Sequence, residues 1–97
     1  MEEVVYYNDL YDLYGMLLTD KQRQYFEDYY FNNLSFSEMA TNYDISRNAV
    51  FKQIHVVIDK LIEYEEKLGL LKKREILNEL VTNIDDLDLK SKLEDLI

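Results

Sequence analysis

The stretch of residues 35–54, SFSEMATNYDISRNAVFKQI, decides the fold. Ser35 and Glu38 stand three residues apart, the spacing at which a serine and a glutamate cap the start of a helix. Ser46 is placed to cap a second helix, because a serine hydroxyl accepts a hydrogen bond from a backbone N–H of the first turn. The stretch therefore predicts a short helix over residues 36–43, a tight turn, and then a second helix.

Three features of this stretch together indicate a helix-turn-helix unit. Ala40 is small at the place where the two helices would cross closely, and Ile45 supplies an apolar side chain within the turn. Val50 and Ile54 fall one turn apart on the second helix, where they would pack under the first. In such a unit the start of the second helix is exposed and can enter the major groove of DNA.

The side chains expected to be exposed at the start of that second helix are the candidate contact residues: Arg47, Asn48, Phe51, Lys52 and His55. Arg47 and Lys52 suit phosphate or guanine, and Asn48 suits adenine. His55 is interpreted as an ordinary surface residue, which a lone histidine on a helix more often is than a pH switch. Phe51 has two open interpretations: an exposed anchor or base wedge, or a ring covered by the C-terminal tail.

Two further helices are predicted before this unit. An apolar face at helical spacing predicts the first over residues 6–18. Its members are Leu10, Leu13, Tyr14 and Leu17. Thr19 and Gln22 form another capping pattern, which predicts the next helix over residues 20–31. Its aromatic side chains are interpreted as core rather than as a stacking surface for RNA; they are Tyr25, Phe26, Tyr29, Tyr30 and Phe31.

A long helix is predicted over residues 47–68, with Gly69 placed to end it. Its apolar residues step by four and three and form a heptad-like seam: Val50, Ile54, Val57, Leu61, Tyr64 and Leu68. This apolar seam is longer than the three shorter helices before it would need for packing. We therefore expect the C-terminal segment to fold back on the distal half of this helix, and a second copy of the chain to cover part of the rest.

Composition supports an all-α helix-turn-helix bundle with a long recognition helix and a fold-back C-terminal helical tail. The 97 residues contain no Pro and two Gly, too little turn chemistry for a β-sandwich. The expected organisation is a single helical domain (1–97), with a helix-turn-helix core (1–68) and a tail (69–97).

Composition also argues against several functions. The absence of Cys excludes disulfides and thiolate zinc sites, and no catalytic constellation accompanies the single His. We expect no enzyme activity, no cofactor, no metal and no small-molecule substrate. Apolar runs are too short for a membrane span. The acidic start does not resemble a signal peptide, so a cytoplasmic location is expected.

The charge distribution limits nucleic-acid binding. The net charge is −9, yet residues 46–74 carry seven bases and four acids. Strong duplex binders neutralise about six to ten phosphates, whereas about three bases lie near the groove-facing end here. We therefore expect weak binding by one chain, and a homodimer that doubles the number of bases.

Several segments resemble region 4 of bacterial sigma factors. They are Leu18-Thr19, Gln22-Arg23, Tyr29-Tyr30, Leu34-Ser35, Glu38-Met39-Ala40 and the run from Ile45 to Val50. Within that superfamily the chain most resembles the YlxM family of small regulatory helix-turn-helix proteins. The resemblance covers about two-thirds of the chain. The sequence differs from sigma region 4 at Asp44, at Phe51 and in the apolar residues that follow Ile54.

The resemblance implies a regulatory role in the signal recognition particle pathway, through contact with the particle's RNA or its GTPase. Two alternatives stay open. One is a dimeric, sequence-specific DNA-binding transcription regulator. The other is a protein interaction module that has lost nucleic-acid binding, which the acidic balance and Phe51 favour.

Overall fold

The computed structural model describes residues 2–97, in which all regular structure is helical. The elements are α1 (Glu2–Tyr14), a 3-10 turn η1 (Gly15–Leu17), α2 (Asp20–Tyr30), α3 (Phe36–Tyr43), α4 (Arg47–Leu68), α5 (Leu70–Thr82) and α6 (Leu87–Glu94). The all-α prediction is confirmed. The bounds predicted for α3 and α4 match, whereas α1 starts earlier than expected.

Side-chain caps fix where α2, α3 and α4 begin. Thr19 and Ser35 each form a complete capping box at the starts of α2 and α3. The Ser46 hydroxyl accepts a hydrogen bond from the Ala49 amide at 3.0 Å and so caps α4. Each cap satisfies backbone donors that would otherwise lack partners at a helix start.

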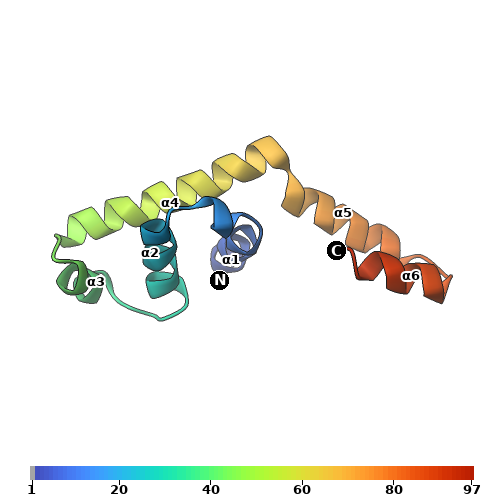
Figure 1. The fold of residues 1–97 in the computed structure, drawn as a ribbon, viewed down its shortest axis with the longest axis horizontal. Coiled ribbons are helices and arrows are strands. Elements are labelled where there is room, and N and C mark those ends of the chain that lie inside the picture. Colours follow the sequence, from blue (N-terminus) through green and yellow to red (C-terminus); the bar gives the residue numbers. More distant parts are fainter. Residues whose placement is uncertain (1) are drawn as a thin grey trace.

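The turn between α3 and α4 depends on Asp44. Its φ of 54° and ψ of 48° place it in the left-handed region, which aspartate tolerates better than most residues. The Ile45 amide then donates to the Ala40 carbonyl at 3.0 Å. The chain therefore reverses within a few residues and starts α4 across the end of α3 (Figure 1).

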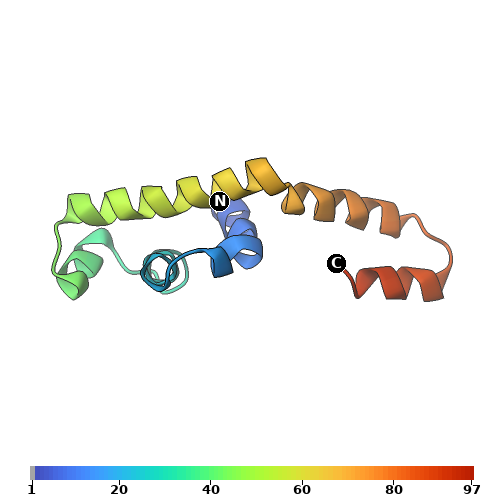
Figure 2. The same cartoon turned by 45° about the horizontal axis from the view of Figure 1, so that its top comes forward.

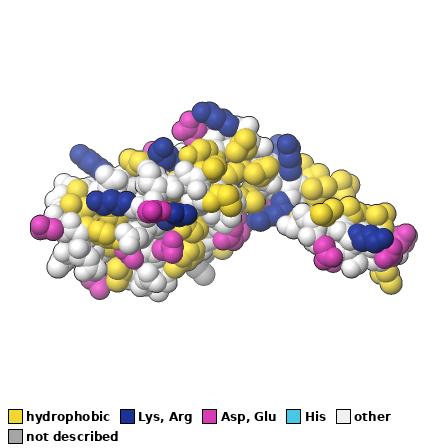
Figure 3. Space-filling view, viewed as in Figure 1, with side chains coloured by type: hydrophobic (Ala, Val, Ile, Leu, Met, Phe, Trp, Pro, Cys, Tyr) yellow, Lys and Arg dark blue, Asp and Glu magenta, His cyan; other side chains and the backbone are white. Residues whose placement is uncertain are grey.

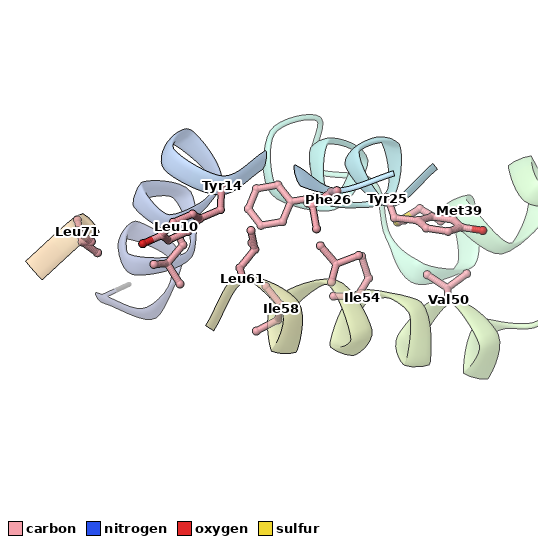
Figure 4. Packing of buried hydrophobic residues seen from close by; sticks show 12 residues of the cluster. Leu10, Tyr14, Tyr25, Phe26, Met39, Val50, Ile54, Ile58, Leu61 and Leu71 are labelled. Atoms are coloured by element: carbon pink, nitrogen blue, oxygen red, sulfur yellow. The ribbon is translucent and has the colours of Figure 1, made fainter. Parts of the chain in front are cut away.

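The core lies along one side of α4, where α1, α2 and α3 pack against it (Figure 4). The largest fully buried side chains are Tyr14, Phe26, Leu10, Met39, Leu61, Val50 and Val57. Most of the α4 seam is therefore covered within one chain. The expectation that the tail would cover the distal half of this seam was wrong, because α1 packs there.

The C-terminal tail leaves the body instead of returning along α4. Gly69, at φ 63°, ends α4, and α5 starts at the next residue and runs outward (Figures 1 and 2). Along its length α5 packs mainly on α1 and α6. The tail does fold back, but on itself: α5 ends at Thr82, and after a short connection α6 returns along α5. The prediction that the tail folds back onto α4 was therefore wrong.

A hydrogen-bonded junction holds α5 in this direction. Tyr14, fully buried on α1, donates its hydroxyl to the Glu65 carboxylate at 2.6 Å and accepts the Leu70 amide at 3.0 Å. Glu65 also accepts the amides of Leu71 at 3.0 Å and Lys72 at 3.2 Å. These two side chains cap the start of α5, which has no cap on its own N-terminal residue, Gly69.

The junction predicts an acid dependence of stability. Burial by itself raises the pKa of the Glu65 carboxyl, but hydrogen bonds from Tyr14, Leu71 and Lys72 outweigh it and hold the pKa below its ordinary value. The folded state therefore binds this proton less readily than the unfolded chain. The stabilisation is complete at neutral pH and is lost as pH falls through the folded-state pKa.

We expect the difference in unfolding free energy between the wild type and Glu65→Gln to be largest at neutral pH and to shrink below about pH 4. Thermal unfolding followed by circular dichroism at several pH values measures it. Glu66→Gln, an exposed carboxylate on the same helix, is the matched control. A Glu65→Gln difference that stays constant from neutral to acid pH would contradict the expectation.

Candidate nucleic-acid interface

The start of α4 is exposed at the end of the molecule that carries α3 (Figure 1). The structure places the five candidate contact residues on the first three turns, and all of them are exposed: Arg47, Asn48, Phe51, Lys52 and His55. We call this surface the α4 face. Its position follows from the caps and the Asp44 turn, since the opposite side of α4 is held against the core.

Two aromatic rings lie against each other on the α4 face. The Phe51 and His55 ring centroids lie 4.3 Å apart, with the planes tilted by 58°. Phe51 is 48% exposed, and the tail lies at the far end of the molecule. The interpretation that the tail covers Phe51 was therefore wrong. A large exposed aromatic ring remains available to a partner.

The ring of Phe36, on α3, packs against this pair through Phe51. Its ring meets Phe51 edge-on at 6.0 Å and stacks on Tyr29 at 4.8 Å. Phe36 is the first residue of α3, so the Ser35 cap also sets where its ring points. Its role was missed from the sequence, although an aromatic residue directly after a cap and close to the recognition helix is a usable signal.

Two hollows flank Phe51. One, of about 470 Å³, is lined by Phe36, Ser46, Arg47, Asn48 and Phe51. The other, of about 380 Å³, lies farther along α4 and includes Tyr7, Tyr30, His55, Ile58 and Ile62, with the carboxylates of Glu3 and Asp59. The first suits a planar base beside a cation, whereas the second carries acidic groups that repel phosphate.

The cations of the α4 face are not engaged within the chain. Three ion pairs form among residues 2–97, and none includes Arg47 or Lys52. Arg23, on α2, is paired with Asp20. Asp44 is exposed at the turn beside the face. Positive charge on this surface is thus limited to two free side chains.

Other kinds of site are not assembled in the part of the chain that the structure describes. No three potential metal-ligating side chains gather among residues 2–97. In the same residues no helix has both the length and the apolar character needed to cross a bilayer. The α4 face is a surface with recognisable chemistry for a large partner.

A capped α3, a tight turn, and an exposed start of α4 define a helix-turn-helix protein. A family model described as "Putative helix-turn-helix protein, YlxM / p13 like" matches residues 1–97, and the chain belongs to this family. Its relatives include a UPF0122 protein from Ureaplasma parvum serovar 3, 44% identical over 90% of this chain and 88% of the relative. Another, from Geobacillus kaustophilus, is 42% identical over 89% of this chain and 78% of the relative.

Proposed function

We propose that this chain is a regulatory helix-turn-helix protein of the signal recognition particle pathway, and that its α4 face binds the particle's RNA. The observation that carries the proposal is the exposed pair of Phe51 and His55 rings, 4.3 Å between centroids, beside the free cations of Arg47 and Lys52. Sequence-specific RNA recognition stacks unpaired bases on aromatic side chains while cations neutralise the neighbouring phosphates.

Magnitudes favour structured RNA with unpaired bases over duplex DNA. Stacking one base on an aromatic ring contributes about 1–3 kcal/mol. Two phosphate contacts, by comparison, fall well short of the six to ten typical of strong duplex binders. A bulky Phe51 also stands where a polar side chain would be needed to pair with a base edge in the major groove.

Pairing of two copies is part of this proposal. A homodimer carries two α4 faces and so doubles both the cations and the stacking rings available to one RNA. This raises affinity through the high effective concentration of the second face. A cytosolic location also belongs to the proposal, because the RNA in question is cytosolic.

The test measures binding to the particle RNA as a function of salt, for three variants. Arg47→Ala combined with Lys52→Ala should lower affinity at least about tenfold and reduce the salt slope by about one for each cation. Phe51→Ala should lower affinity by about 1–3 kcal/mol and leave the salt slope unchanged. Lys60→Ala, an exposed base two turns beyond Lys52 on α4, is the matched control and should change little.

The same series separates the alternatives. Tighter binding to a particular DNA duplex than to the RNA would favour the dimeric transcription regulator. Absence of binding to both RNA and DNA at micromolar protein and low salt would contradict the proposal. The remaining hypothesis would then be the protein interaction module, for which Phe51→Ala should weaken capture of the particle's GTPase.

A further inference from the structure

Aromatic side chains from α1, α2, α3 and α4 line the hollow of about 380 Å³ beside the α4 face, which we call the aromatic groove. Six rings follow one another along it, and the centroids of neighbouring rings lie 4.3–6.1 Å apart. In order they are Tyr7, Tyr30, Tyr29, Phe36, Phe51 and His55. Such a row of rings gives a partner a large and rigid apolar surface.

Aliphatic side chains and free hydroxyl groups complete the lining of the aromatic groove. Ile54 and Ile58 are buried there, and Ile62 is half-buried. Three hydroxyl groups of the groove form no hydrogen bond among residues 2–97, those of Tyr7, Tyr29 and Tyr30. The groove can therefore hold an apolar side chain and also offer hydrogen bonds to a polar group beside it.

The charged side chains that line the aromatic groove all carry negative charge. Glu3 and Asp59 are exposed there, and neither forms an ion pair among residues 2–97. Within the same described residues no Lys or Arg lines the groove. Burial, the neighbouring Tyr29 and Tyr7, and the charge of Glu3 raise the pKa of Tyr30 to about 12, so its hydroxyl remains a donor at neutral pH.

This single sign of charge distinguishes the groove from the other exposed apolar surface of the molecule. On the tail, α5 and α6, hydrophobic side chains lie among charges of both signs (Figure 3). Such a mixed surface does not select a partner by charge, whereas an apolar groove with two unpaired carboxylates does.

We propose that the aromatic groove binds a basic, apolar segment of a partner protein, in which an arginine lies beside a large aliphatic residue. The aliphatic side chain packs on the isoleucines and rings. The arginine lays its methylene stem along the tyrosines and pairs its guanidinium with Glu3 or Asp59. The inference goes beyond the proposed function, because the occupant is a peptide and the site contains none of the cations that serve RNA.

Charge complementarity identifies this occupant. An RNA segment would bring its phosphates against two unpaired carboxylates, which repel them. A purely apolar peptide would desolvate Glu3 and Asp59 without giving either of them a partner, which costs free energy. Arginine meets both requirements of the groove, because its planar guanidinium stacks on aromatic rings and matches the geometry of a carboxylate.

The test titrates the full chain with defined peptides at neutral pH and low salt, and follows amide chemical shifts by NMR. The probe is an acetylated, amidated hexapeptide of repeated Leu-Arg pairs. It should bind with a dissociation constant below about 1 mM and shift the amides of Tyr7, Tyr30 and Ile62 more than those of α6. Peptides of Leu-Glu or Ala-Arg pairs, which lack the charge or the apolar side chain, should each bind at least about tenfold more weakly.

Paired variants separate the groove from the general attraction of an acidic chain for a basic peptide. Glu3→Gln with Asp59→Asn should weaken the Leu-Arg peptide about fivefold, the loss of two exposed ion pairs. Asp12→Asn with Glu66→Gln removes the same charge from exposed positions of α1 and α4 outside the groove and should change binding less than about twofold. All four substitutions are at exposed side chains, so the circular dichroism spectrum should be unchanged.

Equal losses for the two double variants, or a Leu-Glu peptide that binds as tightly as the Leu-Arg peptide, would overturn the inference. Groove amides that shift with the particle RNA, or with protein concentration alone, would overturn it too, since RNA or a second copy would then occupy the groove. Arg47→Ala with Lys52→Ala should weaken RNA but not the peptide, and Glu3→Gln with Asp59→Asn the reverse. Failure of RNA binding and failure of peptide binding are therefore measured separately.

Discussion

Phe26→Ala is expected to lower the free energy of unfolding by about 3–5 kcal/mol, the cost of replacing a buried Phe by Ala. Phe26 is 0% exposed. Its ring stacks on Tyr11 at 4.3 Å with an interplanar angle of 4°, and it lies 4.6 Å from Tyr30. A small domain is stable by only about 5–15 kcal/mol, so the variant should unfold at a much lower urea concentration. Urea denaturation followed by circular dichroism measures the change.

Phe31→Ala is the matched control for this prediction. Phe31 meets the Phe26 ring edge-on at 5.7 Å but is 48% exposed. Since less surface is buried and no closed cavity forms, the loss should stay near about 1 kcal/mol. Equal losses for the two variants would show that the aromatic cluster around Phe26 is not the centre of the core.

Tyr14→Phe is expected to cost about 1–3 kcal/mol although it removes a single oxygen. The variant keeps the buried ring but leaves the Leu70 amide without its acceptor and removes one of the three hydrogen bonds that Glu65 accepts. Burial, together with the hydrogen bond to Glu65, raises the pKa of the Tyr14 hydroxyl, so it stays protonated and able to donate at neutral pH. Hydrogen exchange should accelerate at the first amides of α5 more than at those of α3.

Tyr64→Phe provides the comparison, because Tyr64 packs 5.9 Å from the Tyr14 ring and its hydroxyl forms no hydrogen bond among residues 2–97. It should leave both stability and exchange at α5 nearly unchanged. If Tyr14→Phe behaves in the same way, the junction does not set the direction in which α5 leaves the body. The contacts of α5 with α1 must then set it.

Local signals were sufficient to predict most of the fold. A cap and its partner lie three residues apart, so Thr19, Ser35 and Ser46 mark helix starts in the sequence alone. The tight turn after α3 is likewise a local signal, because it depends on one residue, Asp44, that tolerates the left-handed region. The exposed α4 face follows from these features, because once α3 and α4 are joined by a tight turn the side of α4 opposite its apolar seam must point outward.

The course of the tail could not be predicted in the same way. Apolar spacing at Leu77 and Leu80 shows that α5 has an apolar side but does not say which surface meets it. The contact that directs α5 joins Tyr14 to Glu65, 51 residues apart, and no pattern along the chain indicates it. The choice between an exposed and a covered Phe51 depended on the course of the tail, and the sequence left it open for the same reason.

The α4 face and the C-terminal tail lie at opposite ends of the long axis of the molecule, which measures 56 Å (Figure 1). A macromolecule that occupies the α4 face therefore leaves the exposed side chains of α5 and α6 uncovered unless it extends along most of that axis.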